Sequence, residues 1–397
     1  MKAKRKVIVV GPLPPPISGQ ALAVQMLVDG FAERGVSYRV VNLTSGTREK
    51  IGTKFRALQY AKILLDYIWK TAFGKKTVYI TIAQSLQGFW RDFFMVWIAV
   101  FFGHRILLHL HGGNYDRFYD AQQAWLRTVI RVTLRRADGI YVLGEKLIGM
   151  FDFEPALAPK ISVITNGIPI AAEDQSGSKR LPDSPDEPIR LLYLSNLIES
   201  KGYLHVLEAV RQLVHDYRLN VKCSFYGKFL ASRDDIMVRD AEHGRQLFET
   251  FILQNGLSDY VEFGGTVEGE AKIKALEEAH FFVLPTNYDN EGQPLAIIEA
   301  LAYGHVVITT DYRAISDMVT DKQNGAFVPF ADPDSIARNI ADIASDHERY
   351  AAMSEAAKIR YRNQFTREAH LERMFSLLLE EKYETTQNGR YGRMTNV

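Results

Sequence analysis

Short apolar runs alternate with helix-length segments along most of this chain, and this alternation constrains the fold more than any other feature. The strand-like runs of the first half are Val7–Val10, Tyr38–Asn42, Val78–Ile82, Ile106–His111, Gly139–Val142 and Ile161–Ile164. Segments with the length of a helix lie between them, at about 21–35, 54–72, 87–102 and 121–136. Strands that alternate with helices at this spacing pair in parallel through crossover helices, so the pattern predicts a doubly wound α/β sheet.

The same alternation starts again after a polar interruption at residues 171–188, which are rich in turn-forming residues and have the composition of a linker. The later strand-like runs are Arg190–Leu194, Val221–Tyr226, Val261–Phe263, Phe281–Leu284, Val306–Thr309 and Ala326–Val328. Helical segments follow at about 201–216, 235–255, 270–279, 294–303 and 333–345. We therefore expect two Rossmann-like domains, residues 1–170 and 189–365, with a ligand-binding cleft between the carboxyl ends of their strands.

The C-terminal residues and the charge distribution add two expectations. A last helix at about 366–383 is expected to pack back on the first domain, and the polar residues 385–397 are expected to be disordered. Residues 1–170 carry 23 Lys and Arg against 11 Asp and Glu, a balance of +12, although the whole chain stands at +1. This asymmetry favours an anionic partner for the first half, phospholipid or a phosphate-bearing acceptor; the alternative is an unevenly charged solvated surface.

The cysteine content and the lack of long apolar runs indicate the cellular compartment. Cys223 is the single cysteine, so no internal disulfide can form and a reducing compartment is expected. The apolar run after the basic start covers only Val7–Val10 and is better explained as a buried strand than as a signal peptide. No run approaches the roughly 20 apolar residues of a membrane-spanning helix. We expect a cytoplasmic protein, soluble or peripheral.

The segment FFVLPTNYDNEGQPLAIIEALAYG, which begins at Phe281, carries the most chemical information. Pro294 is expected to open a helix and Gly304 to end it, and the residues between them are apolar on every side of the helix. Glu299 is the exception. A buried carboxylate is unfavourable unless it is paired, so Glu299 must face a basic partner or a polar cleft.

The loop before this helix completes an anion site. Free N–H groups at about Gln293–Ala296, together with the helix dipole, suit a diphosphate. Glu291 lies at the cleft end of the loop, and a carboxylate can accept hydrogen bonds from two adjacent hydroxyls of a sugar or ribose. The alternative is that Glu291 caps the helix and Glu299 forms a structural ion pair.

The Glu-x7-Glu spacing, with Pro294 and a helix of small residues, resembles the donor site of retaining family 4 glycosyltransferases (glycosyl transferases group 1), which have the GT-B fold. In that family the first glutamate meets hydroxyls of the transferred sugar and the second meets the ribose. The resemblance assigns these roles to Glu291 and Glu299. Gly292, Gln293, Pro294 and Leu295 would then form the donor-binding turn between them.

The stretch LLYLSNLIESKG resembles the Gly-Arg-x4-Lys-Gly motif of the same family. Lys201 matches the lysine that grips the donor diphosphate; taken by itself, it would be read as a solvated lysine. Asn196 occupies the position of the family's arginine, so one of two cationic groups is replaced by an amide that can still donate hydrogen bonds.

Four further places follow the family less closely. Ser18-Gly19 stands where the family has Gly-Gly, so close backbone approach at an N-terminal phosphate cradle depends on Gly19; an ordinary strand–helix turn is the alternative. His111 matches a histidine beside the donor sugar, whereas His109 is expected to be a core residue. Asn166 is expected to be a turn residue. Arg313-Ala314 and Asp317 replace the family's Gly-Gly-x-x-Glu, and no role is assigned to them.

The resemblance implies a retaining transfer of a hexose from a UDP- or GDP-linked donor, with Glu291, His111 and Lys201 as catalytic residues and without a metal or cofactor. The alternatives are a non-catalytic module that binds sugar nucleotides and a nucleotide-sugar epimerase. A dinucleotide-dependent dehydrogenase would need a G-x-G-x-x-G turn after the first strand, and Gly11-Pro12-Leu13-Pro14 does not provide it.

The acceptor is expected to be a lipid-linked saccharide in exopolysaccharide, O-antigen or other cell-surface glycan assembly. Arg127, Arg131 and Arg135 recur at four-residue intervals in the segment 121–136, which is typical of a helix lying on an anionic membrane. The apolar run Phe93–Phe102 is too short to span and is expected to be a buried crossover helix. We expect a peripheral protein on the inner face of the cell membrane, without a nucleic-acid partner.

Overall fold

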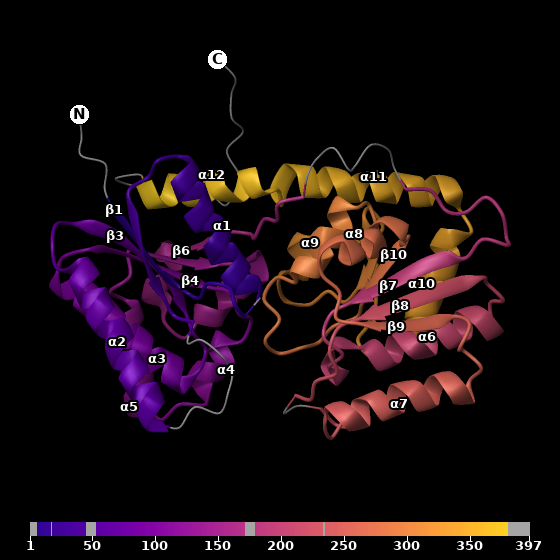
Figure 1. The fold of residues 1–397 in the computed structure, drawn as a ribbon, viewed down its shortest axis with the longest axis horizontal. Helices are drawn as coiled ribbons and strands as arrows, with labels where there is room; N and C mark the ends of the chain where they lie inside the picture. The colour runs from indigo at the N-terminus through magenta and orange to yellow at the C-terminus, as the bar shows by residue number, and fades with distance from the viewer. Residues whose placement is uncertain (1–5, 17, 45–52, 171–178, 233–234, 380–397) are drawn as a thin grey trace, which may run out of the picture.

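The computed structural model describes residues 6–16, 18–44, 53–170, 179–232 and 235–379. Figure 1 shows two α/β domains side by side, with a pair of C-terminal helices running along one edge of both. Residues 171–178 of the expected linker and residues 385–397 fall outside this description. Across the part of the chain that is described, no helix combines the length and apolarity needed to cross a bilayer.

The N-terminal domain is built on a six-stranded sheet in the order β2-β1-β3-β4-β5-β6, and all of its pairings are parallel. The strands are β1 (Lys6–Gly11), β2 (Tyr38–Asn42), β3 (Lys76–Ile82), β4 (Arg105–Leu110), β5 (Gly139–Val142) and β6 (Ile161–Val163). The strand order reverses direction at β1 and β3, so the loops that follow these two strands diverge and leave room for a ligand.

The C-terminal domain repeats this plan in the order β12-β11-β10-β7-β8-β9, again with parallel pairing throughout. Its strands are β7 (Ile189–Leu194), β8 (Val221–Tyr226), β9 (Val261–Gly265), β10 (Phe281–Leu284), β11 (Val306–Thr309) and β12 (Gly325–Phe327). Here the order reverses between β7 and β10. The expected GT-B architecture of two facing parallel sheets is confirmed, because buried parallel strands are continuous apolar runs that a sequence displays directly.

The helices also follow the expected segments, with three differences. Those of the first domain are α1 (Gly19–Glu33), α2 (Thr53–Thr71), α3 (Leu86–Phe101), α4 (Tyr115–Asp120) and α5 (Ala124–Leu134). Those of the second are α6 (Tyr203–His215), α7 (Ala241–Gln254), α8 (Gly269–Glu278), α9 (Leu295–Ala302) and α10 (Pro333–Ala344). Two more close the chain, α11 (His347–Gln364) and α12 (Arg367–Leu379).

The first difference is that two expected helices begin late: the one at 121–136 begins only at Ala124, and the one at 235–255 begins only at Ala241. The second is α11, which the sequence did not predict: its buried side includes Ser354 and Lys358, so no apolar stripe marks it. The third concerns α3. The expectation that Phe93–Phe102 is wholly buried is wrong, because Phe94 is 50% and Phe101 83% exposed.

The last helix completes the core of the first domain. Leu371, Met374 and Phe375 of α12 belong to the same buried cluster as Val9 of β1 and Phe31 of α1. The rings of Phe375 and Phe31 lie 5.2 Å apart. The chain therefore returns to the N-terminal domain after building the second one (Figure 1), and its two crossings lie side by side, because Ile168 pairs with Thr366.

We expect Phe375→Ala to lower the free energy of unfolding of the N-terminal domain by about 3–5 kcal/mol, because it opens a cavity between α1 and α12. Urea denaturation followed by tryptophan fluorescence measures this domain selectively, since Trp69, Trp90, Trp97 and Trp125 all lie in it. Leu379→Ala is the matched control on the same helix, because Leu379 is 37% exposed. An equal effect of the two substitutions would contradict the assignment of α12 to this core.

Candidate functional site

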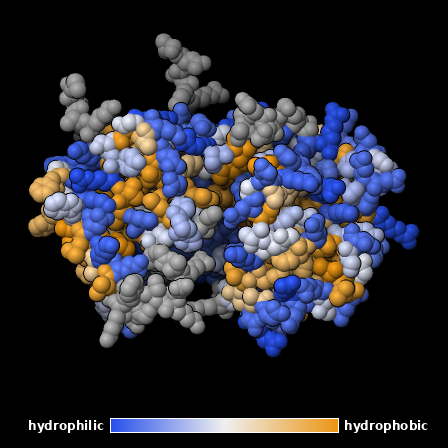
Figure 2. Space-filling view, in the orientation of Figure 1, coloured by the Kyte–Doolittle hydropathy of each residue, from blue (hydrophilic) through white to orange (hydrophobic). Residues whose placement is uncertain are grey.

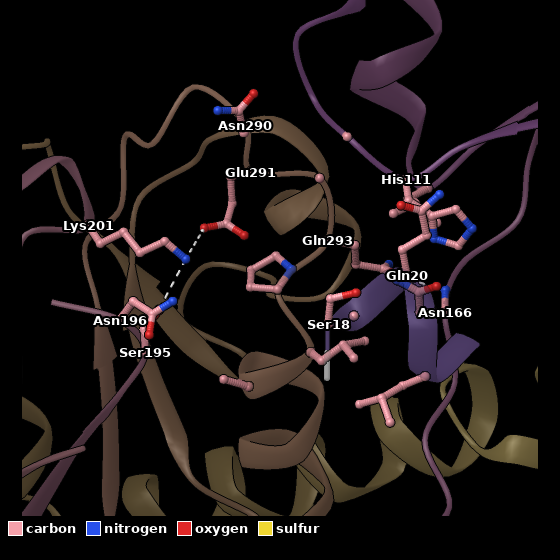
Figure 3. Close-up of a pocket in the computed structure, with 18 of the residues that line it drawn as sticks. Ser18, Gln20, His111, Asn166, Ser195, Asn196, Lys201, Asn290, Glu291 and Gln293 are labelled. Atoms are coloured by element: carbon pink, nitrogen blue, oxygen red, sulfur yellow. Dashed lines mark hydrogen bonds and ion pairs between the residues drawn. The ribbon is translucent and has the colours of Figure 1, made fainter. Parts of the chain in front are cut away.

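A cleft of about 820 Å³ lies between the carboxyl ends of the two sheets. Every residue expected to be catalytic or donor-binding lines it: Gly19, His111, Asn196, Lys201, Glu291, Gly292, Gln293, Pro294, Leu295 and Glu299. Figure 3 shows Lys201 and Glu291 turned toward each other on the side of the C-terminal domain, with His111 and Asn166 on the opposite side. The cleft lies at the reversal points of both sheets, where open α/β folds bind ligands.

Lys201 and Glu291 form an ion pair across the two loops that leave β7 and β10. The ammonium nitrogen lies 3.1 Å from Glu291 Oε2, and it donates a hydrogen bond to Ser195 Oγ at 3.1 Å. The side chains of Lys201 and Glu291 are only 14% and 9% exposed. The ammonium also lies 5.1 Å from the centre of the Tyr288 ring, which favours a cation at this position. The pair places a fixed positive and a fixed negative charge side by side in the cleft.

The backbone brings these two loops together through Gly202. This residue has a φ of +80°, and a β-carbon placed on it would lie 2.5 Å from the carbonyl oxygen of Pro285. Only glycine satisfies both conditions. The position of the Lys201 side chain therefore depends on the residue that follows it.

Glu299 forms the second ion pair of the cleft. Its Oε1 accepts a hydrogen bond from Lys272 Nζ of α8 at 2.6 Å. Burial raises the pKa of Glu299, and the ammonium of Lys272 opposes that rise. The sequence required either a basic partner or a polar cleft for this carboxylate, and the structure provides both. Lys272 was not predicted, because it lies on a polar helix with nothing to set it apart from Lys274.

The loop before α9 differs slightly from the expectation. Pro294 is the residue that caps the helix, with a φ of −66°, and Leu295 is the first helical residue. Pro294, Leu295 and Ala296 all line the cleft. The helix therefore presents its N-terminal end, with its unpaired N–H groups and partial positive charge, to any anion held there.

Gln293 links the two domains directly. Its Oε1 accepts a hydrogen bond from the backbone N–H of Asn166 at 2.6 Å, and both side chains are almost fully buried. Within the described residues, Gln293 Nε2 and Asn166 Oδ1 are buried without a hydrogen-bond partner. A donor and an acceptor left unpaired at a cleft wall suit ligand hydroxyl groups, which can serve both.

His111 follows β4 directly and is half-buried at the cleft wall, with both ring nitrogens shielded from solvent. Burial lowers its pKa to about 3, and the proximity of His370 on α12 adds to this effect. The ring is therefore neutral at physiological pH, and neither ring nitrogen has a hydrogen-bond partner among the described residues. The neighbouring His109 is a core residue whose Nδ1 lies 2.7 Å from the hydroxyl of Tyr79. His111 can thus donate one hydrogen bond and accept another.

The loops of the two domains meet backbone to backbone across the cleft. A β-carbon on Gly292 would lie 2.3 Å from the carbonyl oxygen of His111, and one on Gly113 would lie 2.0 Å from that of Glu291. Asn290 adds side-chain contacts, because its Oδ1 accepts hydrogen bonds from Gln84 at 3.1 Å and from Asn114 at 2.8 Å. Glycine at positions 113 and 292 is therefore required for this approach of the domains.

Asn196 and Gly19 lie at opposite sides of the cleft. Asn196 is exposed, and its Oδ1 is 3.4 Å from the backbone N–H of Lys228. Gly19 is the first residue of α1, directly after the capping residue Ser18, and a β-carbon there would lie 3.5 Å from Leu295. This distance is an ordinary contact, so the protein itself does not require glycine at position 19.

Asp317, for which the sequence predicts no role, joins the domains. Its Oδ2 accepts a hydrogen bond from the backbone N–H of Glu145 at 2.7 Å. Nearby, Lys146 Nζ lies 2.5 Å from Asp311 Oδ1. These contacts lie outside the cleft and fix the relative position of the two sheets.

Comparison with known proteins finds similarity to one family over slightly less than half of the chain. Residues 175–360 match the family described as glycosyl transferases group 1. The amylovoran biosynthesis glycosyltransferase AmsK of Erwinia amylovora is 26% identical over 276 residues, 68% of this chain and 60% of that protein. The phosphatidyl-myo-inositol mannosyltransferase of Mycobacterium tuberculosis is 26% identical over 215 residues, 52% of this chain and 51% of that protein.

Among solved structures, that of Anabaena HepE in complex with UDP superimposes with a TM-score of 0.67 at 14% identity, over 94% of this chain and 99% of that one. This likeness supports the fold alone. The chain spans about half to three fifths of the length of the first curated relatives that it matches.

The Lys272–Glu299 pair makes a pH-dependent prediction. Lys272→Met removes the group that lowers the pKa of Glu299, so that pKa rises further above the value in the unfolded chain. A carboxyl group with a raised pKa stabilises the fold below its unfolded pKa and loses this contribution as the pH rises through its folded pKa. The variant should therefore be destabilised by about 1–3 kcal/mol at pH 8 and by less at pH 5.

Thermal unfolding from pH 5 to pH 8 measures this difference against the wild type. Lys274→Met, two residues away on α8 at an exposed position, is the control. The double variant Lys272→Met/Glu299→Gln should lose the pH dependence. A cost that is the same at both pH values would show that Glu299 does not titrate in this range.

Proposed function

We propose that this chain, a member of the glycosyl transferases group 1 family through residues 175–360, transfers a hexose from a UDP- or GDP-sugar to a saccharide acceptor with retention of configuration. One observation carries the proposal. The residues that the family motifs assign to the donor all line a single cleft between two facing sheets, and Lys201 there contacts Glu291.

In this mechanism the donor diphosphate lies between Lys201 and the start of α9. Lys201 would exchange its contact with Glu291 for one with the phosphate oxygens, while Asn196 and the N–H groups at Leu295 and Ala296 donate hydrogen bonds. Glu291 would then accept hydrogen bonds from hydroxyls of the sugar. Such prearranged donors stabilise the negative charge that develops on a departing diphosphate.

The acceptor hydroxyl attacks the anomeric carbon from the face that the diphosphate leaves, so the configuration is retained. His111 orients the sugar through a hydrogen bond to one of its ring nitrogens. The low pKa of His111 keeps the ring neutral, so one ring nitrogen carries a proton and the other does not. Glu299 holds the ribose, with Lys272 keeping its carboxylate in place. Positioning supplies most of the rate enhancement, and no step assigns a role to a metal or cofactor.

A lipid-linked saccharide in cell-surface glycan assembly is the acceptor that we propose. The name of one relative, phosphatidyl-myo-inositol mannosyltransferase, specifies a lipid acceptor, and the name of another refers to amylovoran biosynthesis. The balance of +12 in residues 1–170 favours an anionic acceptor or surface near the first domain.

A peripheral position at the inner face of the membrane completes this proposal, on different residues from those first expected. Arg135 pairs with Glu154 at 2.6 Å, and Arg127 donates to the carbonyl oxygen of Gln122 at 2.9 Å, so these side chains are engaged within the protein. Large exposed apolar side chains lie on α2 and α3, among them Trp69 and Phe101, and Trp125 of α5 is exposed as well. Flotation with phosphatidylglycerol vesicles at low salt should recover the protein, and its absence from the vesicle fraction would count against membrane binding.

Lys201→Met should lower the rate of sugar transfer by about 100-fold or more, because one charged group that stabilises the departing diphosphate is lost. Lys222→Met is the matched control: Lys222 belongs to the same domain and is exposed outside the cleft. Release of UDP or GDP from a panel of nucleotide sugars, with a lipid extract as acceptor, measures the rate. Equal activity of the two variants would overturn the assignment of Lys201.

The same panel separates transfer from binding alone. Thermal stabilisation by one nucleotide, together with release of that nucleotide from its sugar, supports an enzyme. Stabilisation without any release under all acceptor conditions would favour the non-catalytic alternative, for which the amide at Asn196 in place of an arginine is the supporting feature.

A further inference from the structure

A second cavity, of about 240 Å³, lies on the outer side of the N-terminal domain between α2 and α3. Its walls are Tyr60, Ala61 and Leu64 of α2 with Trp90, Phe94 and Met95 of α3. Gln87 and Arg91 provide its polar edge. We refer to this cavity as the α2–α3 groove. A groove walled mainly by aromatic and aliphatic side chains suits a hydrocarbon rather than a sugar or nucleotide.

The surface around the α2–α3 groove is also apolar. On α2, Leu58, Leu65 and Trp69 are 74%, 67% and 70% exposed, and their spacing places them along one side of the helix. Phe73, just beyond α2, and Phe101, at the end of α3, are 73% and 83% exposed. Figure 2 shows hydrophobic residues gathered on the surface of the N-terminal domain. Exposed apolar groups in such number mark a surface that meets another apolar body.

Helix α3 connects this groove to the cleft. Gln84 and Ser85, directly before α3, line the cleft, while Gln87, Trp90, Arg91 and Phe94 line the groove. At 1.5 Å of rise per helical residue, Phe94 lies about 15 Å along the chain axis from Gln84. One amphiphile could therefore place its polar head at the cleft and its chain in the groove.

Arg91, on the polar edge of the groove, carries a positive charge. Its guanidinium contacts Asp92 Oδ1 at 2.7 Å, and Asp92 Oδ2 accepts a hydrogen bond from the backbone N–H of Ala83 at 2.8 Å. Arg91 is thus fixed relative to the loop that enters the cleft. A guanidinium has five N–H donors, so Arg91 retains some for a phosphate.

We propose that the α2–α3 groove binds the hydrocarbon chain of the lipid that carries the acceptor saccharide, with the lipid phosphate next to Arg91. The groove itself rests on the geometry, whereas the identification of its occupant as part of the acceptor rests on the proposed function. The occupant is a single chain inserted between two helices, which differs from adsorption of the whole face on a bilayer.

Farnesyl phosphate is a soluble probe of this chemistry, and Trp90 in the groove wall provides a fluorescence signal. The full-length protein should show saturable binding of farnesyl phosphate, with farnesol binding more weakly because it lacks the phosphate. Ala61→Phe should weaken binding by about tenfold or more, the loss expected when two methylene groups are displaced from an apolar site. Leu65→Phe, which alters an exposed residue outside the groove, should bind as the wild type does.

Ala61 is itself exposed, so its substitution should leave the thermal unfolding temperature unchanged. The shift of that temperature by UDP or GDP should also be the same in Ala61→Phe and the wild type. This control separates the proposed function from the proposed groove. If the wild type does not bind UDP or GDP, the proposed function is contradicted, but the test of the groove with farnesyl phosphate still holds. Unaltered binding of farnesyl phosphate by Ala61→Phe would overturn the groove. A second result would overturn it as well. If farnesyl phosphate does not bind to the wild type and Ala61→Phe abolishes vesicle flotation, the surface docks on a bilayer and the groove does not bind a single lipid chain.

Discussion

The ion pair between Lys201 and Glu291 is the interaction on which the arrangement of the cleft depends. It joins the loops after β7 and β10, the two strands at which the order of the C-terminal sheet reverses. A buried charge pair needs good geometry and further contacts, and here Ser195 accepts a hydrogen bond from Lys201 while the ring of Tyr288 lies beneath its ammonium. The Lys272–Glu299 pair repeats this arrangement in the same cleft. The charges are therefore held in fixed positions by the protein rather than by solvent.

These fixed charges face residues of the N-terminal domain only because the two domains approach closely. Gly113 and Gly292 allow backbone contact at the cleft, and α12 returns to the N-terminal core on the far side of the interface. The Gln293–Asn166 hydrogen bond lies between these two connections. A residue with a side chain at either glycine would separate the domains and move His111 away from Glu291. The distance between the two halves of the site is thus set by backbone sterics as well as by side-chain bonding.

The sequence predicts the strands well because each is a buried apolar run, and it predicts Glu299 because a carboxylate in an apolar helix needs a partner. It does not predict the identity of that partner. Lys272 lies 27 residues away on a polar helix, and Asn290 meets Gln84 across 206 residues. Helix α11 is missed for a related reason: Lys358 and Ser354 are buried on the face that an apolar stripe would mark. Contacts between residues far apart in the sequence leave no local pattern.

The balance of charge in the cleft determines which groups could hold the diphosphate of the proposed donor. Lys201 and Lys272 are each matched by a glutamate, so these four side chains sum to no net charge. A diphosphate would therefore rely on more than the lysines. The N-terminal ends of α1 and α9 both line the cleft, at Gly19 and Leu295, and each contributes about half a positive charge. In the proposed mechanism two such ends would place about one positive charge beside the diphosphate.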